Sequence, residues 1–233
     1  MTDRTFDYTP RLVEANRAYR VAAPAVDLSK QAVWWTGGVV LDQGQEGSCV
    51  GHGVVGEWLA SPARGRLTSV RVTDEYKAQQ GHYLAVQVYD RARKIDEFEG
   101  DDTEGTSVRA GMLVARERGW ISGFNWAFNL TELRAALQDG PVVIGVEWHS
   151  GMYEAPGGRV TVSGDVVGGH CLVVTGYSPN YSGRGPTYRW RNSWGRGPSG
   201  YGADGNGYIS AVDLDRVLFK SGGEAAVPVG RKA

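Results

Sequence analysis

The segment that most constrains the fold is an apolar run from Val50 to Leu59, which follows a glycine-rich turn and a cysteine, Cys49. Its large side chains recur at helical spacing, so the sequence predicts a helix with a buried stripe. Three positions inside this helix are glycine: Gly51, Gly53 and Gly56. Each glycine costs about 1 kcal/mol relative to alanine in a helix interior. The glycines therefore indicate that something large, such as a second domain, packs closely against this helix.

Cys49 is expected at the first turn of that helix. There the unpaired backbone N–H groups and the positive end of the helix dipole favour a thiolate over a thiol. A lone cysteine at such a place is more often a buried structural thiol, so residues elsewhere must decide its role. The other cysteine of the chain is Cys171, and two cysteines do not form a disulfide framework.

The composition argues against several classes of protein. With 233 residues, of which 41% are hydrophobic and 22% charged, the chain can form one large domain or two lobes of about 100 residues each. A net charge of −1 without long basic runs argues against nucleic-acid binding. There is no apolar run of about 18 residues for a membrane span, and no secretory signal is visible. We therefore expect a cytoplasmic monomer with no nucleic-acid or membrane partner, no metal and no other cofactor.

Helical patterns dominate the first half of the chain, and strand patterns follow. Helices are expected over 10–19, 50–59, 73–93, 107–118 and 130–138, and strands at 142–146, 172–174, 188–191 and 208–209. This order predicts an α+β protein of two lobes, with a ligand site in the cleft between them. We expect an N-terminal extension over 1–25, a helical lobe over 26–120 and a β-rich lobe over 121–233.

Two stretches of the strand-rich half carry chemistry that matches Cys49. His170 stands at the mouth of an apolar strand, and Asn192 ends another strand shortly before an indole, Trp194. Alone, this histidine would be a core residue in most sequences and this asparagine a turn residue. Together with the cysteine they form a nucleophilic set. The thiolate attacks a carbonyl, the imidazole supplies a proton to the leaving group, and the amide orients the imidazole ring.

These motifs resemble the papain family of cysteine peptidases. In chain order they are Gln43-Gly44 with Gly47-Ser48-Cys49, Gly169-His170 before a strand that ends in Gly176-Tyr177, and Asn192-Ser193-Trp194-Gly195. The order Cys–His–Asn and separations close to the roughly 130–150 residues of that signature both fit. The resemblance covers about residues 26–213, and matches at 105–109, 118–120, 132–137 and 140–142 look like a bacterial or phage-type branch. It implies a papain-like fold with a helical N-terminal lobe, an antiparallel β-rich C-terminal lobe and the active site between them.

The resemblance also implies catalytic roles, residue by residue. Cys49 resembles the nucleophile, His170 the general acid and base, and Asn192 the residue that orients the imidazole. Gln43 resembles the side-chain donor of the oxyanion hole, which works together with the backbone N–H of Cys49. Removing one such donor typically costs about 3–4 kcal/mol of transition-state stabilisation.

Three further residues match the family's substrate side. Trp194 resembles the indole that shields the His–Asn hydrogen bond from water. Gly105 and Thr106 fall where the family pairs the extended backbone of a substrate, an interaction that depends on main-chain atoms rather than on sequence.

The chain also departs from the family pattern. Glu46 stands where a second cysteine is usual, and His52 occupies a position that is normally apolar. His52 could be a polarised core histidine or a second partner for the thiolate. A long inhibitory prosegment is missing, and the 25 residues before the enzyme-like part offer too little surface to fill a cleft and also dock on a lobe. We therefore expect the chain to be active as synthesised.

Three interpretations of function stay open. The first is a thiol-dependent peptidase that acts on peptides or proteins through an acyl-enzyme intermediate. The second is a papain-like module that no longer cleaves and serves as a binding or structural part, for instance of a phage particle. The third is another cysteine amidase or transferase, such as a transglutaminase or a cell-wall amidase. The Asn-Ser-Trp-Gly stretch and the glutamine six residues before the cysteine favour the first.

Overall fold

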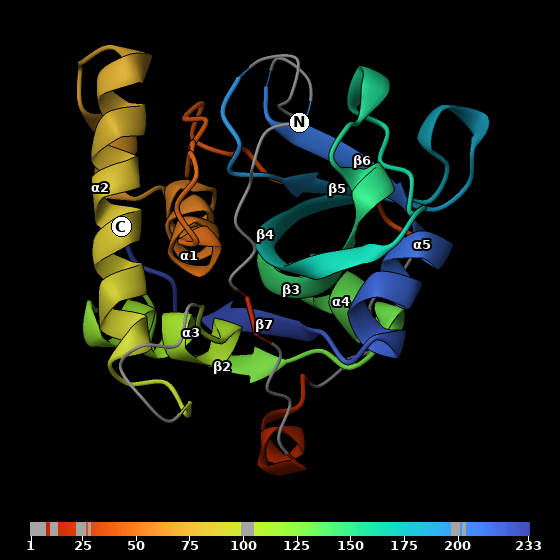
Figure 1. Ribbon diagram of the computed structural model, residues 1–233, viewed down its shortest axis with the longest axis horizontal. Helices are drawn as coiled ribbons and strands as arrows, with labels where there is room; N and C mark the ends of the chain where they lie inside the picture. Colours follow the sequence, from red (N-terminus) through yellow and green to blue (C-terminus); the bar gives the residue numbers. More distant parts are fainter. Residues whose placement is uncertain are drawn as a thin grey trace.

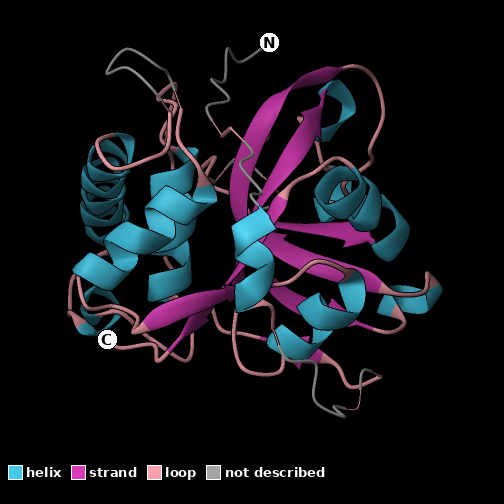
Figure 2. Ribbon diagram, turned by 90° about the horizontal axis from the view of Figure 1, so that it is seen from below, coloured by secondary structure: helices cyan, strands magenta, loops and turns pink. Residues whose placement is uncertain are grey.

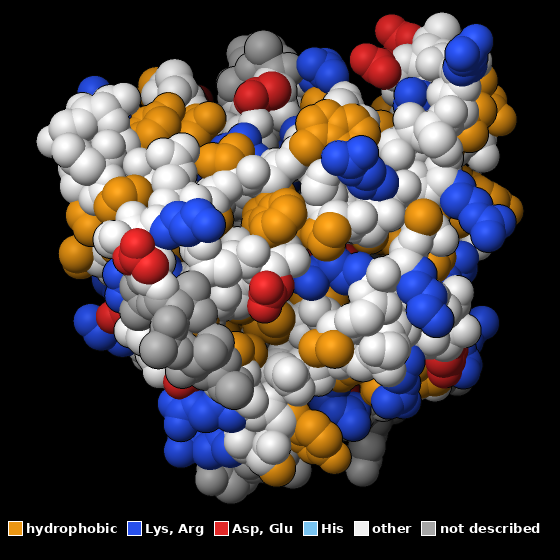
Figure 3. Space-filling view, turned by 180° about the vertical axis from the view of Figure 1, so that it is seen from behind, with side chains coloured by type: hydrophobic (Ala, Val, Ile, Leu, Met, Phe, Trp, Pro, Cys, Tyr) orange, Lys and Arg blue, Asp and Glu red, His pale blue; other side chains and the backbone are white. Residues whose placement is uncertain are grey.

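The computed structural model describes residues 8–9, 14–21, 27, 29–98, 105–196, 201 and 204–233. Of the expected N-terminal extension, residues 1–7, 10–13 and 22–25 lie outside the described part. No helix in the described ranges is long and apolar enough to cross a membrane. On the face shown in Figure 3, Lys and Arg side chains lie in separate small groups and form no continuous basic patch.

The N-terminal lobe is built on three helices: α1 (Cys49–Leu59), α2 (Asp74–Arg93) and α3 (Val108–Glu117). The expected helices over 73–93 and 107–118 are thus confirmed. Helix α2 begins where the Thr73 side chain accepts a hydrogen bond from the backbone N–H of Tyr76, which satisfies one of the unpaired donors at the helix start. Figure 1 shows α1 between α2 on one side and the sheet on the other, so α1 is the central helix.

The glycines of α1 are the places where its neighbours approach. A Cβ atom on Gly51 would lie 2.0 Å from the backbone oxygen of Ala85 in α2. On the opposite side, a Cβ on Gly53 would lie 2.7 Å from the sulfur of Cys171, which belongs to the sheet. Side chains at either position would force these elements apart. The expectation that something large packs closely against this helix is confirmed.

The C-terminal lobe is an antiparallel sheet with the strand order β2-β7-β3-β4-β5-β6, and β1 pairs separately with β4. The strands are β1 (Ala32–Val33), β2 (Gly123–Trp126), β3 (Val142–His149), β4 (Val166–Ser178), β5 (Thr187–Arg191), β6 (Asn206–Ser210) and β7 (Glu224–Val229). The expected strands correspond to β3, β4, β5 and β6, whereas β2 and β7 were not expected. Figure 2 shows the long helices on one side of the strands and shorter helices on the other.

The remaining helical segments are short. They are α4 (Leu130–Ala136), α5 (Ala211–Asp215), which continues into a π-helical turn over Arg216–Lys220, and the 3₁₀ turns Glu14–Tyr19, Arg66–Ser69, Ser150–Met152, Pro156–Gly158 and Tyr181–Gly183. Helix α4 begins at an N-cap, Asn129, whose side chain accepts from the backbone N–H of Glu132. Helix α4 ends two residues before the expected bound.

Two clusters of buried apolar side chains hold the molecule together. One lies among the helices and includes Val54, Leu59, Val88 and Met112. The other lies within the sheet and beneath α4 and α5. The predicted α+β architecture of a helical lobe and an antiparallel β-rich lobe is confirmed.

Candidate functional site

Cys49 is the first residue of α1 and is fully buried. Gly53, one turn further along α1, lies against β4, the strand that carries His170. This contact sets the N-terminal end of the helix beside the β-rich lobe. The two lobes therefore contribute the expected nucleophile and the expected base to the same boundary.

His170 is held by Asn192. Its Nε2 atom lies 2.8 Å from Oδ1 of Asn192, and the same oxygen accepts the backbone N–H of Ser193 at 2.8 Å. Because an amide oxygen can only accept, Nε2 of the imidazole must carry the hydrogen. In the neutral ring, Nδ1 is then the atom that can take up a proton. The structure thus brings two of the expected site residues into direct contact.

Aromatic rings enclose this pair. The His170 ring lies 5.0 Å from the ring of Trp194 and 4.8 Å from that of Trp148, which it meets edge to face. Both indoles are buried, as are His170 and Asn192 themselves. Trp148 was not expected at the site. The predicted strand 142–146 ended two residues too early to include it. In the longer strand, Trp148 shares a face with Val146, which lies opposite His170 in the sheet.

Gln43 is tied to the segment that carries Asn192. Its Oε1 accepts from the Ser193 hydroxyl at 2.7 Å, and its backbone N–H donates to the Ser193 carbonyl at 2.8 Å. Its Nε2 donates to the carbonyl of Glu46 at 2.9 Å. Gln43 is therefore one of the contacts that fasten the chain before Cys49 to the β-rich lobe. Sequence reasoning missed this link through Ser193.

Thr106 is fully buried and pairs with the N-terminal segment. Tyr8 forms a parallel bridge with Thr106, and Thr9 donates its backbone N–H to the Thr106 carbonyl at 3.3 Å. Tyr8 also donates its backbone N–H to the carbonyl of Gly169, the residue before His170, at 3.2 Å. Gly105 has a positive φ of 97° and donates to the Tyr89 hydroxyl at 3.3 Å.

The same N-terminal stretch also docks on the β-rich lobe. The Arg20 guanidinium lies 2.8 Å from the Glu132 carboxylate, and Val21 donates its backbone N–H to the Trp126 carbonyl at 2.9 Å. The stretch therefore reaches the boundary of the lobes and docks on one of them at once. These are contacts of single residues, and the expectation that 25 residues are too few to fill a cleft and also dock on a lobe stays a prediction.

His52 lies on α1 behind Cys49. Its Nδ1 lies 2.8 Å from the Ser48 carbonyl, and its Nε2 lies 3.1 Å from Nδ1 of His82. Burial lowers the pKa of His52 to about 4, and the charge of His82 adds to this, although the Ser48 contact opposes it. Both ring nitrogens are engaged with other groups, an arrangement that fits a polarised core histidine.

Cys171 follows His170 in β4, so its side chain points to the opposite face of the sheet. It is fully buried. Burial raises the pKa of the Cys171 thiol well above its ordinary value, and the charge of Cys49 adds to that shift. Cys171 therefore lies in the core, where burial favours the protonated thiol.

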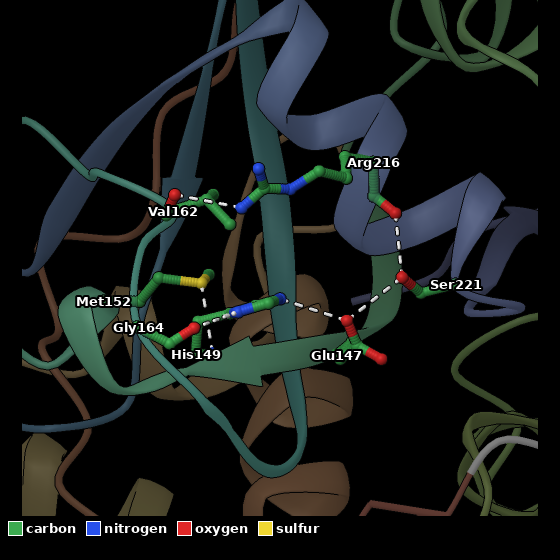
Figure 4. Close-up of polar contacts among 7 residues, drawn as sticks. All are labelled: Glu147, His149, Met152, Val162, Gly164, Arg216 and Ser221. Carbon is green, nitrogen blue, oxygen red and sulfur yellow. Dashed lines mark hydrogen bonds and ion pairs between the residues drawn. The ribbon is translucent and has the colours of Figure 1, made fainter.

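A second polar network lies on the β-rich lobe (Figure 4). His149 lies with Nε2 3.0 Å from the Glu147 carboxylate and Nδ1 3.1 Å from the Gly164 carbonyl. The Ser221 hydroxyl donates to the same carboxylate at 3.1 Å. The network ties the end of β3 to the loop before β4 and to the C-terminal helical turn. Within the described residues, no cluster of three or more His, Cys, Asp or Glu side chains could hold a metal ion.

Solved structures share this architecture. The chain is similar to xylellain, a cysteine protease from Xylella fastidiosa, with a TM-score of 0.66 over 99% of this chain and 98% of that chain at 15% identity. It is also similar to the digestive procathepsin L 3 of Tenebrio molitor larval midgut, with a TM-score of 0.58 over 98% of this chain and 76% of that chain at 16% identity.

Bromelain from Ananas comosus is similar as well, with a TM-score of 0.52 over 83% of this chain and 94% of that chain at 11% identity. No protein-family model and no curated protein matches the chain. The similarity thus lies in the three-dimensional arrangement of helices and strands. The chain has the two-lobed fold of the papain-like cysteine proteases, as its motifs predicted.

Proposed function

We propose that this protein is a thiol-dependent peptidase that uses Cys49, His170 and Asn192 to hydrolyse peptide bonds in peptides or proteins. The observation that carries the proposal is the hydrogen bond of 2.8 Å between His170 and Asn192, enclosed by two indoles. An imidazole held in one tautomer and kept from water at the boundary with a cysteine helix is suited to proton transfer. The similar structures are those of cysteine proteases, which supports the same chemistry.

In the proposed reaction, the Cys49 sulfur attacks the carbonyl carbon of the scissile bond. Nδ1 of His170, as imidazolium, gives its proton to the leaving amine, and a thioester remains on the sulfur. The neutral imidazole then takes a proton from water, whose oxygen attacks the thioester and releases the acid. Asn192 holds the ring through both steps, since its oxygen accepts from Nε2 throughout.

Gln43 is proposed to donate to the oxyanion together with the backbone N–H of Cys49. Its Nε2 now donates to the Glu46 carbonyl, so it has to turn from that carbonyl toward the substrate oxygen. The contact of Oε1 with the Ser193 hydroxyl fixes the other end of the amide and limits how far it can turn. Gly105 and Thr106 are proposed to pair with substrate backbone, and Trp194 to keep water from the histidine.

The test compares the two cysteines. Cys49→Ala should abolish hydrolysis of a fluorescently labelled protein substrate, whereas Cys171→Ala should retain most of the activity, because Cys171 faces the core. Circular dichroism of both variants controls for folding. Turnover that persists in a folded Cys49→Ala variant would overturn the proposal. Cell-wall fragments as a second substrate test for the related amidase chemistry.

A further inference from the structure

A cavity of about 700 Å³ lies between α3, β2 and the 3₁₀ turn Glu14–Tyr19. Helix α3 contributes Arg109, Leu113 and Arg116 to its wall. The turn contributes Asn16, and all of β2 lines the cavity as well. The volume is within the range of known ligand pockets, roughly 300–1,000 Å³. The described lining residues include none of those proposed for catalysis or substrate binding, so this cavity is distinct from the proposed active site.

Strand β2 stands at one end of the sheet order and pairs with β7. Ala127, which follows β2, donates its backbone N–H to the carbonyl of Ala225 in β7. Because the backbone polar groups alternate in direction along an antiparallel strand, those of Phe124 and Trp126 point to the opposite edge. Pro228, which lies opposite Phe124 and has no N–H to donate, fits this alternation. One edge of β2 therefore faces away from the sheet.

The chain itself uses one position of this edge. Val21 donates its backbone N–H to the carbonyl of Trp126 at 2.9 Å, and Arg20 forms a parallel bridge with Trp126. Figure 1 shows the N-terminal 3₁₀ turn, in red, on the side of β2 that faces away from β7. The backbone of Phe124 has no such partner on this edge within the described residues. An unpaired edge is a template for a further strand, and here it borders the cavity.

Two buried polar atoms in the cavity wall have no hydrogen-bond partner in the part of the chain that the structure describes. They are Nδ2 of Asn16, a residue that is 5% exposed, and Oε1 of Glu97. A buried polar group without a partner is costly, so a ligand that satisfies it gains binding free energy. The amide nitrogen can only donate, and the carboxylate oxygen can only accept. A peptide unit offers one carbonyl and one N–H, which are the complementary groups.

The charges of the cavity wall do not balance. Arg109 and Arg116 lie about two turns apart on one face of α3. Nη1 of Arg109 lies 3.8 Å from the Glu97 carboxylate, so this carboxylate is matched by one guanidinium. The Arg116 side chain is exposed and makes no hydrogen bond or ion pair with the described residues. Leu113 lies between the two arginines on the same face. The wall is therefore complementary to an apolar side chain next to an acidic one.

We propose that this cavity is a docking site for an extended, acidic segment of another protein. The segment adds as a strand to the free edge of β2 at Phe124, and one of its carboxylate side chains pairs with Arg116. Main-chain hydrogen bonds to a sheet edge supply affinity in this mode of recognition, and side-chain contacts supply selectivity. Since the cavity shares no described residue with the proposed active site, the inference does not rest on the proposed peptidase function.

Peptide titration tests the selectivity for an acidic segment. The probe is a short peptide of alternating Val and Thr with one central Glu, and two matched peptides carry Gln or Lys in its place. The full chain with Cys49→Ala is titrated calorimetrically, so that no peptide is cleaved. The Glu peptide should bind roughly tenfold or more tightly than the other two, because a hydrogen bond between two charged groups is stronger than one to a neutral group. Equal binding of the three peptides, or tighter binding of the Lys peptide, would overturn the assignment.

The role of Arg116 is tested against a control that removes the same charge nearby. Arg116→Gln should bring the Glu and Gln peptides to within about twofold of each other, since the charged partner is lost. Arg118→Gln should keep the full preference, because the Arg118 side chain contacts Gln87 and the Trp120 ring instead. Circular dichroism controls for folding of both variants. A preference that survives Arg116→Gln, or that Arg118→Gln removes equally, would refute the pairing.

Two methylated versions of the Glu peptide test strand addition. One carries N-methyl groups at its odd positions and the other at its even positions. A strand pairs with an edge through every second residue, so one version should bind as the parent does and the other roughly tenfold or more weakly. In NMR spectra, the backbone amide of Phe124 and the side-chain amide of Asn16 should shift on addition of the parent peptide. Equal binding of the two versions, or unshifted resonances of both residues, would reject strand addition.

The outcomes separate this inference from the proposed function. A peptide that binds at the proposed active site instead would shift the resonances of His170 but not those of Asn16, and Arg116→Gln would not change its affinity. That result would reject the docking site and keep the peptidase. Binding at β2 without hydrolysis of any substrate by the wild-type protein would keep the docking site and reject the peptidase. No measurable binding of the Glu peptide at about 1 mM would overturn the inference.

Discussion

Two buried histidines, His52 in α1 and His170 in β4, have surroundings that differ in kind. His170 lies in the sheet, with one ring nitrogen on the Asn192 amide and its faces covered by indoles. His52 lies in the helix, with one nitrogen near the Ser48 carbonyl and the other near His82. Burial is nearly the same for the two. The two histidines differ in the groups that their ring nitrogens contact.

The comparison shows how the surroundings of a histidine determine which of its ring nitrogens can take up a proton. An amide oxygen against Nε2 of His170 fixes the tautomer and leaves proton exchange to Nδ1. At His52 a carbonyl requires hydrogen on Nδ1, and Nε2 then accepts from His82, so protonation at Nε2 would break that contact. In the proposed reaction His170 changes its charge, whereas the contacts of His52 favour its neutral form.

The largest effect expected from this comparison is on catalysis. His170→Ala should lower kcat/KM by about 10³-fold or more, toward the upper part of the range for general acid and base catalysis. His52→Asn, which keeps an amide donor for the Ser48 carbonyl, should change kcat/KM by less than about threefold. Steady-state kinetics on the labelled protein substrate, with circular dichroism as a folding control, gives both numbers. Comparable losses of kcat/KM in the two variants would contradict the proposed difference between His170 and His52.

A smaller effect is expected when the orienting residue is removed. Asn192→Ala leaves the imidazole in place but frees its tautomer and ring angle, so kcat/KM should fall about 10- to 100-fold, a part of the total acid–base contribution. His82→Ala removes the corresponding partner of His52 and should leave kcat/KM near the wild-type value. An intact rate in folded Asn192→Ala would mean that the indoles alone orient His170.

Sequence patterns predicted the helices α2 and α3 and four of the strands, because the spacing of apolar residues reports directly on local burial. The family resemblance of the sequence also led to the expectation that Asn192 orients His170, and the two side chains lie in contact. The burial of Tyr8 against Gly145 and Gly169 could not be predicted. It depends on the sheet around β3, whose neighbour β7 contains a proline and small residues that leave no clear alternation. Glu224 becomes a partner of Gly145 only through strand register. A contact between Tyr8 and Thr106 has no local signature, because it joins segments that are distant in the chain.

The smallest effect concerns stability and pH. Burial lowers the pKa of His52 to about 4 from 6.5, so this residue favours the neutral form in the folded protein. As the pH falls below 6.5, the unfolded chain binds a proton there and the folded protein does not, which lowers the free energy of unfolding. Linkage gives a loss of about 2 kcal/mol between pH 7 and pH 5 from this group, with little further loss below the folded pKa. Urea unfolding at the two pH values measures the loss, and His52→Asn should show a loss smaller by that amount, because an amide does not titrate. A variant with the same pH dependence as the wild type would show that His52 is protonated in the folded protein, and the contrast with His170 would then disappear.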